Sequence, residues 1–132
     1  NLGAGTVNSN LLNTYAEVTA RATPERPTER TGHQFFGCVL ADHVKTAIGT
    51  RIMTGTIVHT GAMLAMTAPV SGCVPAFSWG TDATPPGTTS AKRFRIDKFL
   101  DIARAVMARR KVTLPDEYAG RLMALWSQGE DA

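Results

Sequence analysis

The chain has 132 residues, enough for one domain, and its 43% hydrophobic and 19% charged residues are typical of globular proteins. No run approaches the roughly 18 apolar residues that a membrane helix needs, so no membrane partner is expected. The net charge of +3 is mild. The basic residues of the last third are interpreted as the solvated face of a helix, so no nucleic-acid partner is expected either.

The first ten residues, NLGAGTVNSN, lack the charged-then-apolar pattern of a secretory signal. They begin with Asn1 rather than Met, inside a phrase that reads like a repeat, which predicts a piece cut from a longer protein. The two cysteines, Cys38 and Cys73, are spaced unlike a metal site or a disulfide framework. Both are expected to be reduced, in a cytoplasmic protein.

Residues 2–13 divide into two hexads, LGAGTV and NSNLLN. Leu2 then holds the first place of a hexad, and Thr6 and Leu12 hold fifth places. Asn8 stands where a first-place aliphatic residue belongs, so an inward Asn8 would need hydrogen-bond partners. Asn10 is expected to be a corner residue, since asparagine tolerates left-handed conformations.

The hexads stop at Thr14, and residues 14–33 are expected to form a loop. The segment ARATPERPTERTGH is polar and rich in turn residues, so it is interpreted as a loop that protrudes from a corner. Loops of this length are often functional, and tolerance of an insertion is the alternative.

The stretch from Leu40 to Leu64 carries the clearest pattern in the chain, a repeat of six residues. First places hold residues such as Leu40, Ile52 and Val58, and fifth places hold small or β-branched residues. A period of six is neither that of a helix nor that of a strand, and it predicts a left-handed parallel β-helix built from hexapeptide repeats. The predicted hexads from residue 34 onward are QFFGCV, LADHVK, TAIGTR, IMTGTI, VHTGAM, LAMTAP and VSGCVP.

Two aromatic residues and a linker follow this repeat. Phe77 and Trp79 are expected to form a lid over the last coil, and stacking on a ligand is the alternative. The segment that follows them is rich in Gly, Pro and Thr. The predicted domains are therefore a β-helix over 1–80 with the inserted loop at 14–33, a linker over 81–93, and a helical extension over 94–132.

Two amphipathic helices are expected in that extension. The first should end near Arg110, and the second should be capped by Thr113. Residues at helical spacing form their apolar stripes: Phe99, Ile102, Ala103, Val106 and Met107 in the first helix, and Tyr118, Leu122, Leu125 and Trp126 in the second. The pair either caps the β-helix or contacts a neighbouring chain.

The three histidines do not predict a metal site. His43 and His59 occupy different hexad places, and His33 lies in the loop, so stacked ligands are not expected. His43 is interpreted either as a surface histidine beside a carboxylate or as an acid–base group that contacts an anionic ligand. Lys45 is likewise either a solvated lysine or a phosphate-binding residue.

The phrase NLGAGTVNSN resembles the NIGAGTITCNY phrase in the C-terminal acetyltransferase domain of bifunctional N-acetylglucosamine-1-phosphate uridyltransferases. CVLADHVKTAIGTRIMTGTIVHTGAMLA is similar to the next coils of that domain, in phase. With VPAFSWG and ARAVMARRKVTL, the ordered phrases resemble GlmU-like sugar-1-phosphate nucleotidyltransferases and acetyltransferases. The resemblance covers most of the chain except the loop.

The resemblance implies a cytoplasmic transferase of nucleotide-sugar and cell-envelope synthesis. Its β-helix would assemble as a homotrimer and N-acetylate a hexosamine phosphate, with acetyl-CoA as the co-substrate. An N-terminal nucleotidyltransferase domain would precede this segment, and Mg²⁺ would be needed only there. The general base is expected upstream of Asn1, so the catalytic residue is unknown and the segment alone is possibly inactive.

The resemblance also implies site residues, matched position by position. Asn1 matches a residue that contacts the sugar phosphate, and the substrate-binding candidates are Asn1, His43 and Lys45. The cofactor-binding candidates are Ala4, Asn10, Leu11, Ile48 and Met66. Two of these depart from the family pattern, because Leu11 stands in place of a tyrosine and Ile48 in place of a serine. These departures favour an alternative, a non-catalytic β-helix that trimerises and regulates a nucleotidyltransferase.

Overall fold

The computed structural model describes residues 1–83 and 92–129. The chain divides into two compact units, residues 1–93 and 94–132. The described part of the first unit is mainly β, and the second contains two helices. Residues 84–91 of the expected linker lie outside the described residues. Of the rest of that linker, Thr81 belongs to one strand and Lys92–Arg93 form another.

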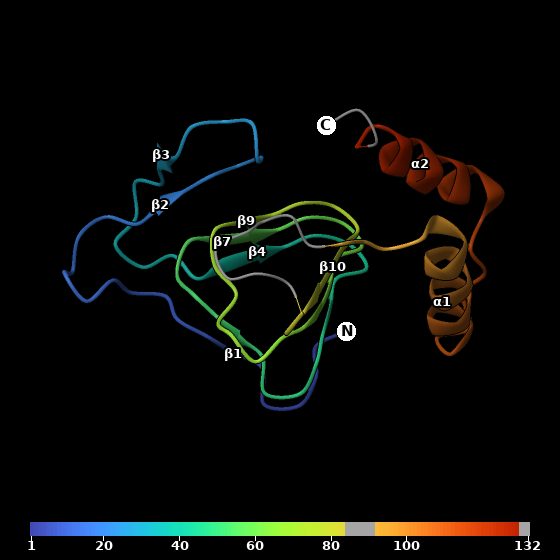
Figure 1. Ribbon diagram of the computed structural model, residues 1–132, viewed down its shortest axis with the longest axis horizontal. Helices are drawn as coiled ribbons and strands as arrows, with labels where there is room; N and C mark the ends of the chain where they lie inside the picture. Colours follow the sequence, from blue (N-terminus) through green and yellow to red (C-terminus); the bar gives the residue numbers. More distant parts are fainter. Residues whose placement is uncertain (84–91, 130–132) are drawn as a thin grey trace. The chain divides into compact units, whose positions relative to one another are not determined.

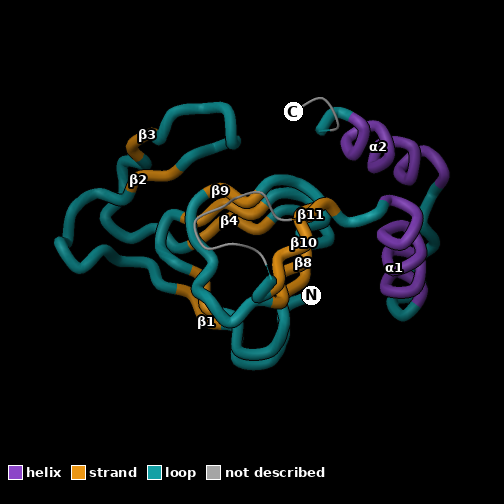
Figure 2. The backbone as a smooth tube through the Cα atoms, viewed as in Figure 1, coloured by secondary structure: helices purple, strands orange, loops and turns teal. Residues whose placement is uncertain are grey.

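The strands of the first unit are short, and turns join them (Figure 2). Their bounds are β1 Val7–Asn8, β2 Thr19–Ala20, β3 Glu29–Arg30, β4 Cys38–Leu40, β5 Lys45–Thr46, β6 Arg51–Ile52, β7 Thr56–Val58, β8 Met63–Ala65, β9 Cys73–Val74, β10 Ser78–Thr81 and β11 Lys92–Arg93.

Three parallel sheets organise the first unit: β1-β6, β4-β7-β9 and β5-β8-β10, with β11 joining β10 in antiparallel fashion. The strands β4, β5 and β6 belong to three different sheets. The strands β7 and β8 and a bridge at Val70 then repeat the same order. The chain therefore winds past the three sheets in a fixed cycle, and its successive turns overlie one another in Figure 1.

The pairing register confirms that one turn of the chain takes three hexads. Cys38 pairs with Thr56, Lys45 with Met63 and Ile52 with Val70, each 18 residues along.

The register shortens after Val70, where Ile57 pairs with Cys73, 16 residues along. The expected last hexad, VSGCVP, is therefore wrong. Val74 lies opposite Val58, at a first place rather than a fifth. The physical cause is Gly72, whose φ of 73° turns the chain two residues early.

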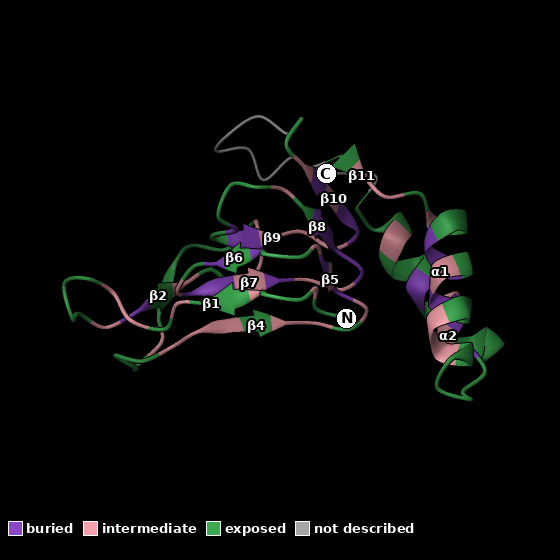
Figure 3. Cartoon of the chain, turned by 90° about the horizontal axis from the view of Figure 1, so that it is seen from below, coloured by how far each residue is buried: buried purple, intermediate pink, exposed green. Residues whose placement is uncertain are grey.

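First and fifth places fill the interior, as the sequence predicts. Val58, at a first place, and Thr56, at a fifth, are fully buried. The central cluster contains Val44, Val58, Ala62, Leu64 and Val70. Burial increases from the turn with β1 and β4 to the turn with β8, β9 and β10 (Figure 3), because an inner turn has a neighbour on both sides.

The fourth place of the hexad is a corner with a left-handed backbone. Gly5, Gly49, Gly55 and Gly61 have φ between 70° and 76°, and His43 takes the same place with φ 60°. In several hexads the fifth-place hydroxyl closes the corner by donating to the carbonyl three residues earlier. Thr6, Thr50 and Thr56 make this bond at 2.7, 2.9 and 2.6 Å, and Ser78 makes it at 2.7 Å.

An arm, defined here as residues 11–35, leaves the coil between Asn10 and Phe36. The Phe36 amide donates to the Asn10 carbonyl at 2.9 Å and closes the base of the arm. The insertion is therefore wider than the expected loop at 14–33, and the expected fifth-place role of Leu12 is wrong. The leucines at 11 and 12 imitate a hexad, although the chain has already left the coil.

The arm carries a hairpin in which β2 pairs with β3 in antiparallel fashion. Val18, 1% exposed, anchors it against the coil beside Gly55. His59 Nε2 and the Ala22 carbonyl, 2.9 Å apart, form a second tie. Arg30 pairs with Glu17 within the arm, and this bond, with one from the Gly32 amide, lowers the pKa of Glu17. The arm is therefore docked on the coil.

The second unit contains α1, Ile96–Ala108, and α2, Asp116–Ser127. Phe99, Leu100 and Ala103 of α1 are buried, as is Leu122 of α2. No helix within the described ranges is long and apolar enough to cross a membrane.

Two details of α2 differ from the sequence-based expectation. The residue before its first turn is Pro115, and no side chain caps it, so the expected cap at Thr113 is wrong. The cause is Pro115, which disfavours helical geometry at Leu114. Leu125, expected in the apolar stripe, is 38% exposed.

Two glycine substitutions test the docking of the arm. An added Cβ at Gly55 would lie 2.6 Å from the Thr19 carbonyl oxygen, whereas one at Gly49 would meet nothing within 4 Å. Both residues have positive φ, so Gly49→Ala should cost about 1–2 kcal/mol from backbone strain alone. Gly55→Ala should cost about 1 kcal/mol or more beyond that. Urea unfolding measures both, and equal losses would show that the arm is not seated on Gly55.

Candidate functional site

The outer face of the β5-β8-β10 sheet brings together two of the substrate-binding candidates. The Asn1 amino group donates to the Val44 carbonyl at 2.8 Å, and the Thr46 amide donates to the Asn1 carbonyl at 3.2 Å. This is the bonding pattern of a parallel pair centred on Lys45. Asn1 therefore lies directly beside Lys45.

The row continues upward through the sheet. Lys45 pairs with Met63, and Met63 pairs with Trp79. We call Asn1, Lys45, Met63 and Trp79 the outer row. Because Lys45 alternates with the interior residues Val44 and Thr46, its side chain belongs to the outer surface.

His43, the third substrate-binding candidate, lies at the corner that precedes β5. Lys45 Nζ donates to the His43 carbonyl at 3.2 Å, so the two residues are neighbours. Burial lowers the pKa of His43, and the positive charge of Lys45 lowers it further, while Asp42 opposes the shift. The imidazole is therefore mostly neutral at pH 7, the form that can accept a proton.

Lys45 gives this face a partly desolvated positive charge. It is half-buried, and burial lowers the pKa of its ammonium group. No carboxylate within residues 1–83 or 92–129 lies at ion-pair distance from it. A cation without an anionic partner can attract a carboxylate or phosphate.

Three of the cofactor-binding candidates form a second row. The Gly49 amide donates to the Ala4 carbonyl at 2.8 Å, and the 44-residue register of β1 with β6 places Ala4 opposite Ile48. The 18-residue register of β5 with β8 places Ile48 opposite Met66. We call Ala4, Ile48 and Met66 the corner row. Ile48 is 80% exposed, so this row presents an apolar side chain to solvent.

The other two cofactor-binding candidates lie elsewhere. Asn10 and Leu11 stand at the base of the arm, where Thr54 Oγ1 donates to Ser9 Oγ at 2.9 Å and approaches the Leu11 carbonyl at 3.4 Å. This base lies at a different corner of the coil from Ile48. The structure therefore does not bring the five cofactor-binding candidates into one site.

A cavity of about 330 Å³ lies beneath the arm, and none of its lining residues is among the sequence-based candidates. Its lining includes Arg21 and Thr28 of the arm and Cys73 of β9. No sequence spacing relates these residues, because only the docking of the arm brings them together. The sequence offered one signal, the length of the inserted loop.

No group of three or more His, Cys, Asp or Glu side chains lies close enough to hold a metal ion in the described part of the chain. No protein-family model matches this sequence, and no curated protein matches it either.

The lowered pKa of His43 predicts how stability depends on pH. The unfolded chain, with an ordinary histidine pKa of about 6.5, binds more protons than the folded chain in that range. The free energy of unfolding should therefore decrease as the pH falls below about 6.5. His43→Asn removes the titrating group and keeps a residue that tolerates the φ of 60°. Urea unfolding at pH 7.5 and 5.5 should show a smaller loss in the variant, and equal losses would contradict this account.

Proposed function

We propose that the first unit is a left-handed parallel β-helix of the hexapeptide-repeat type. Three observations support this inference: the fixed cycle of three sheets, the 18-residue register, and a corner at the fourth place of each hexad. A solenoid of this kind is a scaffold, and its chemistry depends on the residues of its outer face.

The proposed function is acyl transfer, as the C-terminal domain of a sugar-1-phosphate nucleotidyltransferase. The domain would N-acetylate a hexosamine phosphate with acetyl-CoA, in a cytoplasmic homotrimer. One observation carries the proposal: Asn1, Lys45 and His43 gather at one face of the coil, on the same side of the prism as the corner row. The phrases that resemble the family contain these same residues.

Lys45 and the Asn1 side chain are the groups suited to the substrate phosphate. A charge-assisted hydrogen bond from a partly desolvated ammonium is stronger than one between neutral groups. Backbone amides of the coil can bind the pantetheine chain and stabilise the oxyanion that forms during transfer.

The reaction forms one bond and breaks one bond. The amine nitrogen attacks the thioester carbonyl carbon, the C–S bond breaks, and CoA leaves with the electron pair and takes up a proton. The amine must lose a proton during the attack, and the resemblance places that general base upstream of Asn1. Within the described residues, the neutral imidazole of His43 is the nearest acid–base group to Lys45 in sequence.

A non-catalytic role in trimerisation and regulation is the second candidate. The exposed Ile48 favours it, because an apolar side chain stands where the family has a polar contact to the cofactor. The position of Leu11 at the base of the arm also favours it, because it is separated from the corner row.

A thiol-release assay on the full-length protein separates the two candidates. With acetyl-CoA and glucosamine 1-phosphate, the proposal predicts release of CoA. Lys45→Gln should reduce kcat/KM for the amino sugar phosphate about tenfold or more, mainly through KM, because a charged hydrogen bond contributes about 1.5–3 kcal/mol. Lys98→Gln, at an exposed position of α1, is the matched control and should leave the activity unchanged.

Absence of CoA release over a panel of amino sugar phosphates would reject acyl transfer. A trimer by light scattering, together with that absence, would support the regulatory candidate. A monomer would count against both.

A further inference from the structure

The cavity beneath the arm combines groups from three separate parts of the chain. It is lined by Thr19, Ala20, Arg21, Pro24 and Thr28 of the arm, Thr54 and Gly55 of one turn of the coil, and Gly72 and Cys73 of the next. Its volume of about 330 Å³ lies within the range of small-molecule sites.

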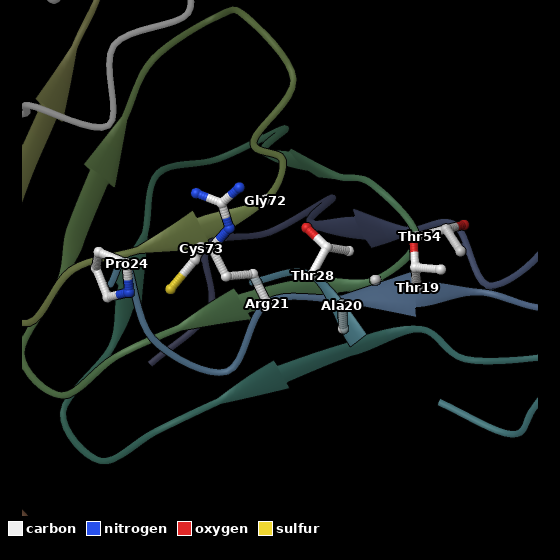
Figure 4. Close-up of a pocket in the computed structure, with 9 residues that line it drawn as sticks. Thr19, Ala20, Arg21, Pro24, Thr28, Thr54, Gly72 and Cys73 are labelled. Atoms are coloured by element: carbon white, nitrogen blue, oxygen red, sulfur yellow. The ribbon is translucent and has the colours of Figure 1, made fainter. Parts of the chain in front are cut away.

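The lining is divided by chemistry. Figure 4 shows the Arg21 side chain, Pro24 and the Cys73 sulfur toward one end, and the side chains of Thr19 and Thr54 toward the other, with Thr28 between them. One end therefore presents a guanidinium, and the remainder presents hydroxyl groups.

Arg21 is available to a ligand. Its charge is not balanced by a carboxylate at ion-pair distance within the described ranges, whereas Arg26 and Arg30 of the same arm pair with Glu29 and Glu17. A guanidinium can bind a phosphate or carboxylate through two parallel hydrogen bonds.

Cys73 forms part of the floor. Its side chain is 4% exposed, and burial raises the pKa of its thiol, as does the charge of Glu25, while Arg21 lowers it. The influence of Arg21 on this thiol agrees with a guanidinium close to the sulfur. A neutral buried thiol is a poor nucleophile, so Cys73 belongs to the wall of the cavity and serves as a reporter of its occupancy.

We propose that this cavity binds a small hydroxylated anion of about hexose-phosphate size, with Arg21 on the anionic group and the threonine hydroxyls on the body. The site is separate from the outer row and does not depend on acyl transfer. The anchoring of the arm by Val18 and by the bond between His59 and Ala22 holds the cavity in shape without a ligand.

The test uses the rate at which a thiol reagent modifies Cys73. The chain has two cysteines, so Cys38→Ala leaves Cys73 as the single thiol, and alanine already occupies an equivalent fifth place at Ala62. The probes are glucose 6-phosphate, glucuronate, inorganic phosphate and glucose, with the full chain at pH 8. Amide shifts of Gly72 and Cys73 in NMR spectra provide a second measurement.

Glucose 6-phosphate or glucuronate should slow the modification in a saturable manner, and glucose should not. A stronger effect of one of the two shows whether the site prefers phosphate or carboxylate. Arg21→Gln should raise the concentration needed for half-protection about tenfold or more, since a charged hydrogen bond contributes about 1.5–3 kcal/mol. Arg26→Gln removes a charge from the same arm outside the cavity and should change nothing.

Three results would overturn the proposal. The first is no protection and no amide shift with any anionic probe. The second is protection that persists unchanged in Arg21→Gln. The third is equal protection by inorganic phosphate and glucose 6-phosphate, which would remove the role of the hydroxyl groups.

Discussion

The corner of the hexad is the constraint on which the rest of the structure depends. Each side of the coil must turn within one residue of positive φ, and glycine provides that residue at 49, 55 and 61. The fifth-place hydroxyl then closes the turn by a hydrogen bond to the second-place carbonyl, as Thr50 and Thr56 do. Because this bond satisfies a buried hydroxyl, the same residue can both fill the interior and fix the corner.

His43 and Phe77 are the departures from this rule, and both lie in one column with Gly61. The Gly61 amide bonds to the Asp42 carbonyl, and the Phe77 amide bonds to the Thr60 carbonyl. A bulky residue at positive φ is rare. Phe77 is fully buried, so packing offsets its strain, in agreement with its expected place at the last coil. The half-buried His43 has no such packing explanation, and its neighbour Lys45 makes this corner the chemical one.

The sequence predicts the repeat well and its interruptions poorly, for a physical reason. From Leu40 to Leu64 each hexad repeats both an interior residue and a corner residue, so only one register fits. At Val70 either register fits, because Val70 and Val74 are both aliphatic and only Gly72 marks the shorter side. The arm is similar, since Leu11 and Leu12 imitate a hexad. The proximity of Arg21 to Cys73 arises from tertiary docking, which no local pattern encodes.

The central claim is that the chain winds with a turn of 18 residues that shortens to 16 after Val70. NMR contacts between backbone protons of adjacent strands measure this spacing directly. The account predicts contacts that join Cys38 to Thr56 and Lys45 to Met63, followed by contacts that join Ile57 to Cys73. Contacts at hairpin spacing between successive strands of residues 38–74, or a constant spacing of 18 through Cys73, would contradict it.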